Sequence, residues 1–179
     1  ASPAQLNQLT HDLQAAATVP LLVSIDQEGG MVNRLKEKYG FPASVSQQFL
    51  GQQDDLALTR QYATATAKAL ASAGINLNLA PVVDLNINPD SPAIGHYERS
   101  FGADPELVTR HALAVIGAHH EQGVLCTLKH FPGHGSASTD SHLDIVDVTK
   151  TWQESELEPY RAIIAAGEAD AILTAHVFS

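Results

Sequence analysis

The chain has 179 residues, 44% of them hydrophobic and 17% charged, which is typical of a single globular domain with an apolar core. Twenty acidic residues oppose ten Lys and Arg, and the resulting net charge of −10 argues against nucleic acid as a partner. No apolar run reaches the ~20 residues of a membrane-spanning helix, and the single cysteine, Cys126, excludes an internal disulfide.

Helix and strand signals alternate along the chain. Four predicted helices are bounded by capping residues: the first starts at Ser2–Pro3, the second spans 55–73 and stops before Gly74, the third runs from Asp104–Pro105 to Gly123, and the fourth starts at the capping-box sequence 151–154 and ends near Gly167. Each helix is followed by an apolar run with strand character, at 21–25, 75–84, 124–128 and 171–175. Four helix–strand units in succession predict an α/β protein with a parallel sheet.

Polar residues gather where the predicted strands end. Asp26, Asp84, the pair Lys129–His130 and His176 each follow or finish an otherwise apolar strand. In parallel α/β proteins ligands bind at the carboxyl ends of the strands, so these residues are candidates for one site. For Asp84 the favoured interpretation is a cap on the loop that follows it, rather than a direct ligand contact.

The segment after the third strand is the richest in chemistry. His130 and His134 have the four-residue spacing of a helical zinc pair, but Pro132 and its neighbouring glycines oppose a helix there, and no Cys or Glu nearby completes a ligand set. A metal site is therefore not favoured.

Acid–base chemistry is the alternative for this segment. Asp140 and His142 are two positions apart, so in an extended loop both side chains point to the same side. The carboxylate could then orient the imidazole as a general acid or base. The same spacing also fits a hydrogen bond that only stabilises the loop.

Two further segments carry charged residues in loops. Asp26 and Glu28 precede paired glycines and could form a glycosidase carboxylate pair, although Glu28 could equally tie down the turn, and Asp26 is the better candidate for binding a hydroxylated substrate. Arg34 could brace Asp26 or be a surface cation. Arg99 could bind a ligand, or it could form an ion pair inside its own loop with Glu98 or Asp104.

These motifs together resemble glycoside hydrolase family 3, and specifically its bacterial β-N-acetylglucosaminidases. The most specific part is Lys-His-Phe-Pro-Gly-His-Gly at 129–135 followed by Asp-Ser-His at 140–142, and the segments 25–30, 79–84 and 98–102 support it in family order. The resemblance implies a (β/α)8 TIM-type barrel, of which this chain would supply about four central strand/helix units. Residues 1–179 would then be one partial catalytic domain, truncated at both ends, with exposed barrel edges through which copies could associate.

The resemblance also implies roles for individual residues. By this resemblance Asp26, Arg99, Lys129 and His130 would bind the hydroxyls and ring of a terminal N-acetylglucosamine. Arg34 and His176 are further candidates for substrate binding from their places near the strand ends. His142 would be the general acid/base and Asp140 would orient it, while the nucleophilic aspartate would lie beyond this chain. The implied substrates are cell-wall muropeptides or chitooligosaccharides, without a metal or organic cofactor.

Two alternatives and two departures remain open. The chain could belong to a phosphorylase that uses phosphate in place of water, or it could be a sugar-binding fragment without catalysis. Met31 stands where the family usually has Arg, and His96–Tyr97 lengthen a turn that is shorter in many relatives, which could alter the subsite beside the sugar.

Overall fold

The computed structural model describes residues 1–139 and 146–178. Its centre is a parallel sheet of four strands in the order β1 (Ser24–Ile25), β2 (Leu77–Asn78), β3 (Leu125–Phe131) and β5 (Ala171–Thr174). A separate parallel pair is formed by β4 (Val146–Asp147) and β6 (Val177–Phe178). The predicted α/β class and parallel sheet are confirmed.

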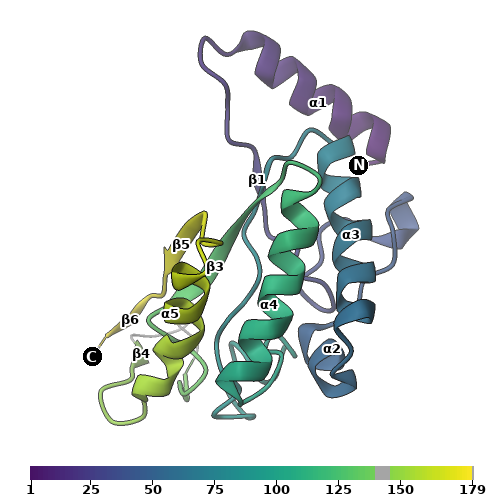
Figure 1. The fold of residues 1–179 in the computed structure, drawn as a ribbon. Helices are drawn as coiled ribbons and strands as arrows, with labels where there is room; N and C mark the ends of the chain where they lie inside the picture. Colours follow the sequence, from purple (N-terminus) through teal and green to yellow (C-terminus); the bar gives the residue numbers. More distant parts are fainter. Residues whose placement is uncertain (140–145, 179) are drawn as a thin grey trace.

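Helices cover one face of this sheet. α3 (Leu56–Ser72), α4 (Pro105–His120) and α5 (Glu158–Ala165) lie side by side along it, and α1 (Pro3–Ala16) lies across one end (Figure 1). The remaining helices are α2 (Gln47–Gln53) and two short 3-10 helices, η1 (Glu37–Tyr39) and η2 (Glu154–Leu157). None of the helices in the described ranges is long and apolar enough to cross a membrane.

The predicted helix caps hold for the first three of the expected helices. Ser2, Asp55 and Asp104 each accept a backbone N–H with the side chain. Gly74, with φ +72°, lies just past the end of α3 in the left-handed conformation that a glycine adopts without strain. The first three capping signals in the sequence therefore act as helix caps.

The prediction for the fourth helix start is wrong. The capping box joins Gln153 to Glu156 and opens η2, after which α5 begins at Glu158. Thr151 instead lies in a turn, where its N–H is donated to the carbonyl of Val148. The capping box thus lies two positions later than predicted, with a glutamine in place of the usual Ser or Thr at the cap.

Three of the four strands are shorter than predicted, most of all the one expected at 75–84, whereas β3 extends beyond the predicted 124–128 to Phe131. Ladder pairing along β2 covers only Leu77 and Asn78, since Pro81 removes a backbone donor, and Val82 rejoins the sheet through one bridge to Lys129. Gln47 of α2 holds this irregular stretch: its side chain donates to the carbonyl of Val82 at 2.8 Å and accepts the Val82 N–H at 3.0 Å. The backbone just before Asp84 is thereby fixed.

The main apolar core lies between the sheet and its helices. Val108, Ile116, Leu128 and Ile163 are fully or almost fully buried there. Cys126 is also buried, as expected of a core thiol, and burial raises the pKa of its thiol. On β5, Ile172 and Leu173 keep 41% and 39% of their surface exposed. Self-association through such an edge stays a prediction.

Candidate active site at the carboxyl ends of the strands

A cavity of about 460 Å³ opens where β1, β3 and β5 end. The six residues predicted from the sequence to bind a ligand all line it: Asp26, Arg34, Arg99, Lys129, His130 and His176. Asp140 and His142 lie outside the described residues. The parallel sheet thus brings together side chains that are more than a hundred positions apart in the chain.

Lys129 is the buried cation of this cavity. Its side chain is 2% exposed, and its Nζ lies 2.8 Å from Asp26 Oδ1 and 2.6 Å from Glu28 Oε1. A buried ammonium needs such partners, because an unpaired charge in the interior is costly. Burial alone would raise the pKa of the Asp26 carboxyl, but the hydrogen bond and charge of Lys129 outweigh it and hold that pKa below its usual value. Asp26 keeps 39% of its side chain exposed and is open to a ligand.

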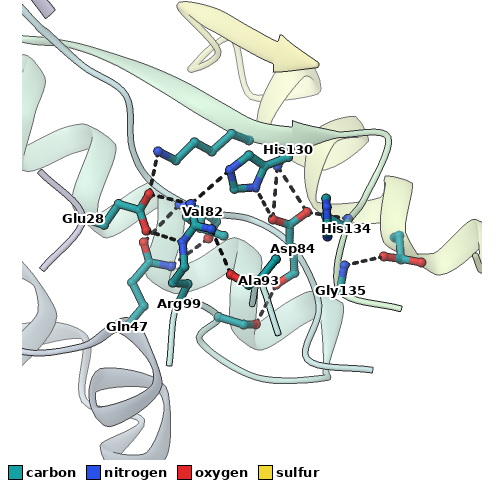
Figure 2. Close-up of polar contacts among 12 residues, drawn as sticks. Glu28, Gln47, Val82, Asp84, Ala93, Arg99, His130, His134 and Gly135 are labelled. Atoms are coloured by element: carbon teal, nitrogen blue, oxygen red, sulfur yellow. Dashed lines mark hydrogen bonds and ion pairs between the residues drawn. The ribbon is translucent and has the colours of Figure 1, made fainter. Parts of the chain in front are cut away.

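Glu28 joins Lys129 to Arg99. The Arg99 guanidinium donates from Nε to Oε2 and from Nη2 to Oε1 of Glu28, each at 2.8 Å, in the two-pronged geometry that favours arginine (Figure 2). Its Nη1 donates to the Ala93 carbonyl at 2.9 Å. Burial would raise the pKa of Glu28, but the Arg99 hydrogen bonds and the Lys129 charge lower it below its usual value.

Arg99 therefore has a different partner from the two that the sequence suggested. Its partner is neither Glu98 nor Asp104 but Glu28, 71 positions away. Glu98 has φ +54°, and Asp104 is engaged as the cap of α4. Among the described residues, the Glu28 side chain does not tie down its own turn, as one interpretation had it, but pairs with two cations from distant segments, Lys129 and Arg99. Arg34 lines the cavity without an ion pair to Asp26 among the described residues, although its charge also lowers the pKa of Asp26.

Asp84 is completely buried behind His130. Its carboxylate accepts the backbone N–H of His134 at 2.8 Å, the backbone N–H of His130 at 3.2 Å, and the Nδ1–H of His130 at 2.7 Å (Figure 2). Burial would raise the pKa of Asp84, but the interactions with His130 and the backbone donors keep it lowered. The expectation that Asp84 caps the loop that follows it is wrong, because its carboxylate accepts from backbone donors of the loop after β3 instead.

These contacts give both ring nitrogens of His130 a partner. Because an ionised Asp84 only accepts, Nδ1 carries a hydrogen, and Nε2 is free to accept from Arg99 Nη2 at 3.1 Å. Both ring nitrogens of His130 are thus engaged. His130 is therefore suited to holding Arg99 and the cavity wall in place, and not to delivering a proton.

The carboxylates of this network are equally unsuited to acid catalysis. Asp26 and Glu28 share one ammonium, and both have a lowered pKa, which favours their ionised forms at neutral pH. This arrangement argues against the interpretation of the two residues as a glycosidase acid/nucleophile pair. What the cavity offers is a rigid set of ionised acceptors and cationic donors, as the binding of a hydroxylated ligand requires.

The helical zinc pair that the spacing of His130 and His134 suggests can be compared with the described residues. No group of three or more His, Cys, Asp or Glu side chains within 1–139 and 146–178 could hold a metal ion. The rings of His130 and His134 are 6.1 Å apart between centroids, and Nδ1 of His130 is already bound to Asp84. The segment 130–134 is not helical, so the four-residue spacing does not place the two imidazoles on one helix face.

Comparisons with known proteins agree with this geometry. The family description "Glycosyl hydrolase family 3 N terminal domain" matches residues 2–179. A β-hexosaminidase of Tolumonas auensis is 40% identical over 178 residues, covering 97% of this chain and 52% of the relative. A β-hexosaminidase of Xylella fastidiosa strain M23 is 41% identical over 186 residues, covering 99% and 53%. The chain spans about half the length of these curated relatives.

Solved structures show the same fold. A glycoside hydrolase family 3 β-N-acetylglucosaminidase from Paenibacillus sp. FPU-7 superposes with a TM-score of 0.90 at 41% identity, covering 99% of this chain and 34% of that one. NagZ from Neisseria gonorrhoeae, in complex with N-trifluoroacetyl-D-glucosamine, gives 0.89 at 34% identity, covering 99% and 53%. The predicted barrel is confirmed at this level: the four strand/helix units form about half of such a domain.

We expect the ionised network to make folding sensitive to acid. Asp26, Glu28 and Asp84 all have lowered pKa values, so their stabilisation is fully present above about pH 5 and is lost as the pH falls through those lowered values. Urea unfolding at pH 7, 5 and 3 measures this loss. The variant Asp84→Asn, which removes one of these carboxyls, should show a shallower dependence on pH. If the free energy of unfolding fell equally with pH in both proteins, the lowered pKa of Asp84 would not contribute to the acid sensitivity.

Proposed function

Because the chain belongs to glycosyl hydrolase family 3, we propose that it is part of the catalytic barrel of a retaining β-N-acetylhexosaminidase. This enzyme would remove terminal β-linked N-acetylglucosamine from cell-wall muropeptides or chitooligosaccharides. The observation that carries the proposal is the buried network of Asp26, Lys129, Glu28, Arg99 and His130 on the cavity wall. The relatives' names support the sugar: several are β-hexosaminidases, and one was solved with an N-acylated glucosamine.

Sugar binding follows from the groups that stay open to the cavity. Asp26 is ionised and partly exposed, so it can accept from sugar hydroxyls, while Lys129 and Arg99 can donate to them. Glu28 pairs with both cations and keeps them fixed, so little conformational entropy is lost when a ligand binds. Arg34 and His176 also line the cavity and are proposed to contact the sugar or its substituents.

We propose His142 as the general acid/base, with Asp140 orienting it. The support comes from the sequence motif and from the other titratable groups near the cavity: Asp26 and Glu28 have lowered pKa values, and both ring nitrogens of His130 are engaged. In the proposed mechanism His142 protonates the leaving oxygen while an aspartate outside these 179 residues attacks the anomeric carbon. Water, deprotonated by the same histidine, then hydrolyses the glycosyl-enzyme.

The reaction type can be tested by its product. The protein to use is a polypeptide that contains this sequence and has the length of its β-hexosaminidase relatives, called the full-length form below. Incubated with 4-nitrophenyl N-acetyl-β-glucosaminide, it should release free N-acetylglucosamine at a rate that does not depend on phosphate. A product of N-acetylglucosamine 1-phosphate would assign a phosphorylase instead. Sugar binding without turnover would leave only a binding function.

A further inference from the structure

A second buried carboxylate lies behind the loop that follows β3. Glu156 of η2 is fully buried, and no Lys, Arg or His among the described residues pairs with it. Its Oε2 accepts the backbone N–H of Gly135 at 3.2 Å, and its Oε1 accepts the backbone N–H of Gln153 at 3.2 Å. Burial raises the pKa of Glu156, and the negative charge of Asp84 adds to this. Among the described residues, the hydrogen bond from the Gly135 N–H is the backbone contact that joins the Glu156 carboxylate to this loop.

The glycines of this loop are packed too tightly to carry side chains. A Cβ at Gly133, whose φ is +131°, would lie 2.6 Å from Glu156 Cβ, and one at Gly135 would lie 1.6 Å from the carbonyl oxygen of Leu85. The segment 133–135 is therefore held between Glu156 on one side and the chain after β2 on the other.

Hydrogen bonds fix the same segment from the side of β2. The N–H of His134 is donated to Asp84 at 2.8 Å, and the N–H of Asn88 to the carbonyl of Gly135 at 3.0 Å. Figure 2 shows Asp84 and the donor at Gly135 on either side of His134. Asp84 also holds His130, so one short backbone segment is linked both to the cavity wall and to Glu156.

We propose that Glu156 is a positioning residue for catalysis, which acts by fixing the 133–135 segment opposite Asp84. The inference rests on the proposed function. In the sequence, Gly135 precedes His142 by seven positions, so the backbone that Glu156 holds is the stretch from which the chain continues to the proposed acid/base. A misplaced catalytic group can cost ~100-fold in rate even when binding is intact.

The test compares two substrates of the full-length form: N,N′-diacetylchitobiose, whose leaving group needs protonation, and 4-nitrophenyl N-acetyl-β-glucosaminide, whose leaving group needs little. For Glu156→Ala we expect kcat on the disaccharide to fall ~10- to 100-fold, with less than about a threefold change on the activated substrate and in either KM. Glu156→Gln should restore most of the rate, because its amide oxygen can accept from the buried Gly135 N–H and leave the exposed Gln153 N–H to water.

The matched control is Glu154→Ala, which removes an exposed carboxylate from the same 3-10 helix and should leave both rates unchanged. Equal losses on the two substrates, or a loss confined to KM, would overturn the inference. If the alanine variant does not fold, Glu156→Asp carries the same test, since its carboxyl is one methylene shorter.

If the loss of kcat in His142→Ala does not depend on the leaving group, the proposed function fails. If it shows the dependence and the Glu156 variants do not, only the inference on Glu156 fails.

Discussion

Replacing His142 with alanine in the full-length form should lower kcat on N,N′-diacetylchitobiose by roughly 10²- to 10⁴-fold, the usual contribution of a general acid. The loss should be much smaller for glycosyl transfer from 4-nitrophenyl N-acetyl-β-glucosaminide, because nitrophenolate leaves without a proton. Steady-state kinetics on the two substrates measures the difference. The pH dependence of kcat on the disaccharide should also lose the limb that reports protonation of the histidine.

Asp140→Asn is the companion variant for this experiment. The asparagine can still accept a hydrogen bond from the imidazole, but it no longer stabilises the charged ring, so an intermediate loss is expected. His11→Ala, an exposed histidine on α1, is the control and should behave like the unmodified protein. Undiminished turnover of the disaccharide by His142→Ala would reject the acid/base assignment.

Replacing Glu28 with alanine should cost about 3–5 kcal/mol in the free energy of unfolding, as is typical when one partner of a buried ion pair is removed. Lys129 and Arg99 would remain buried, with the partly exposed Asp26 left as the carboxylate partner of Lys129. The same change should weaken binding of N-acetylglucosamine, because both cations lose the group that fixes their position. Urea unfolding and a binding titration on the full-length form measure the two effects.

Glu28→Gln keeps the shape of the side chain and one acceptor oxygen, so its loss should be smaller than that of the alanine variant. Glu37→Ala, in the exposed 3-10 helix that follows the same loop, is the control and should change neither quantity measurably. If Glu28→Ala had the stability and affinity of this control, Glu28 would not be the residue that holds the network together.

The sequence was sufficient for the parts of the structure that depend on local signals. Ser2, Asp55 and Asp104 cap helices because their side chains reach backbone donors two or three positions ahead. The placement of Asp26, Lys129, His130 and His176 around one cavity followed from a general property of parallel sheets, whose carboxyl ends lie along a single edge. Both kinds of inference need only residue order and spacing.

What the sequence could not predict depends on contacts between distant segments. Glu28 and Arg99 are 71 positions apart, and Arg99 has acidic residues much closer in the chain, so spacing favoured the wrong partner. Gln47 and Val82 are 35 positions apart, and Glu156 reaches Gly135 across 21. The burial of Glu156 had no local signal, because an acidic residue in a polar stretch is ordinarily expected to be solvated.

The central claim is that the cavity at the strand ends binds a terminal N-acetylhexosamine through this network. A crystal structure of the full-length form with N-acetylglucosamine tests it most directly. The account predicts the pyranose ring in the cavity, with hydroxyl oxygens within about 2.7–3.2 Å of Asp26 and of Lys129 or Arg99. A sugar bound elsewhere, with these three side chains making only their present contacts, would contradict it.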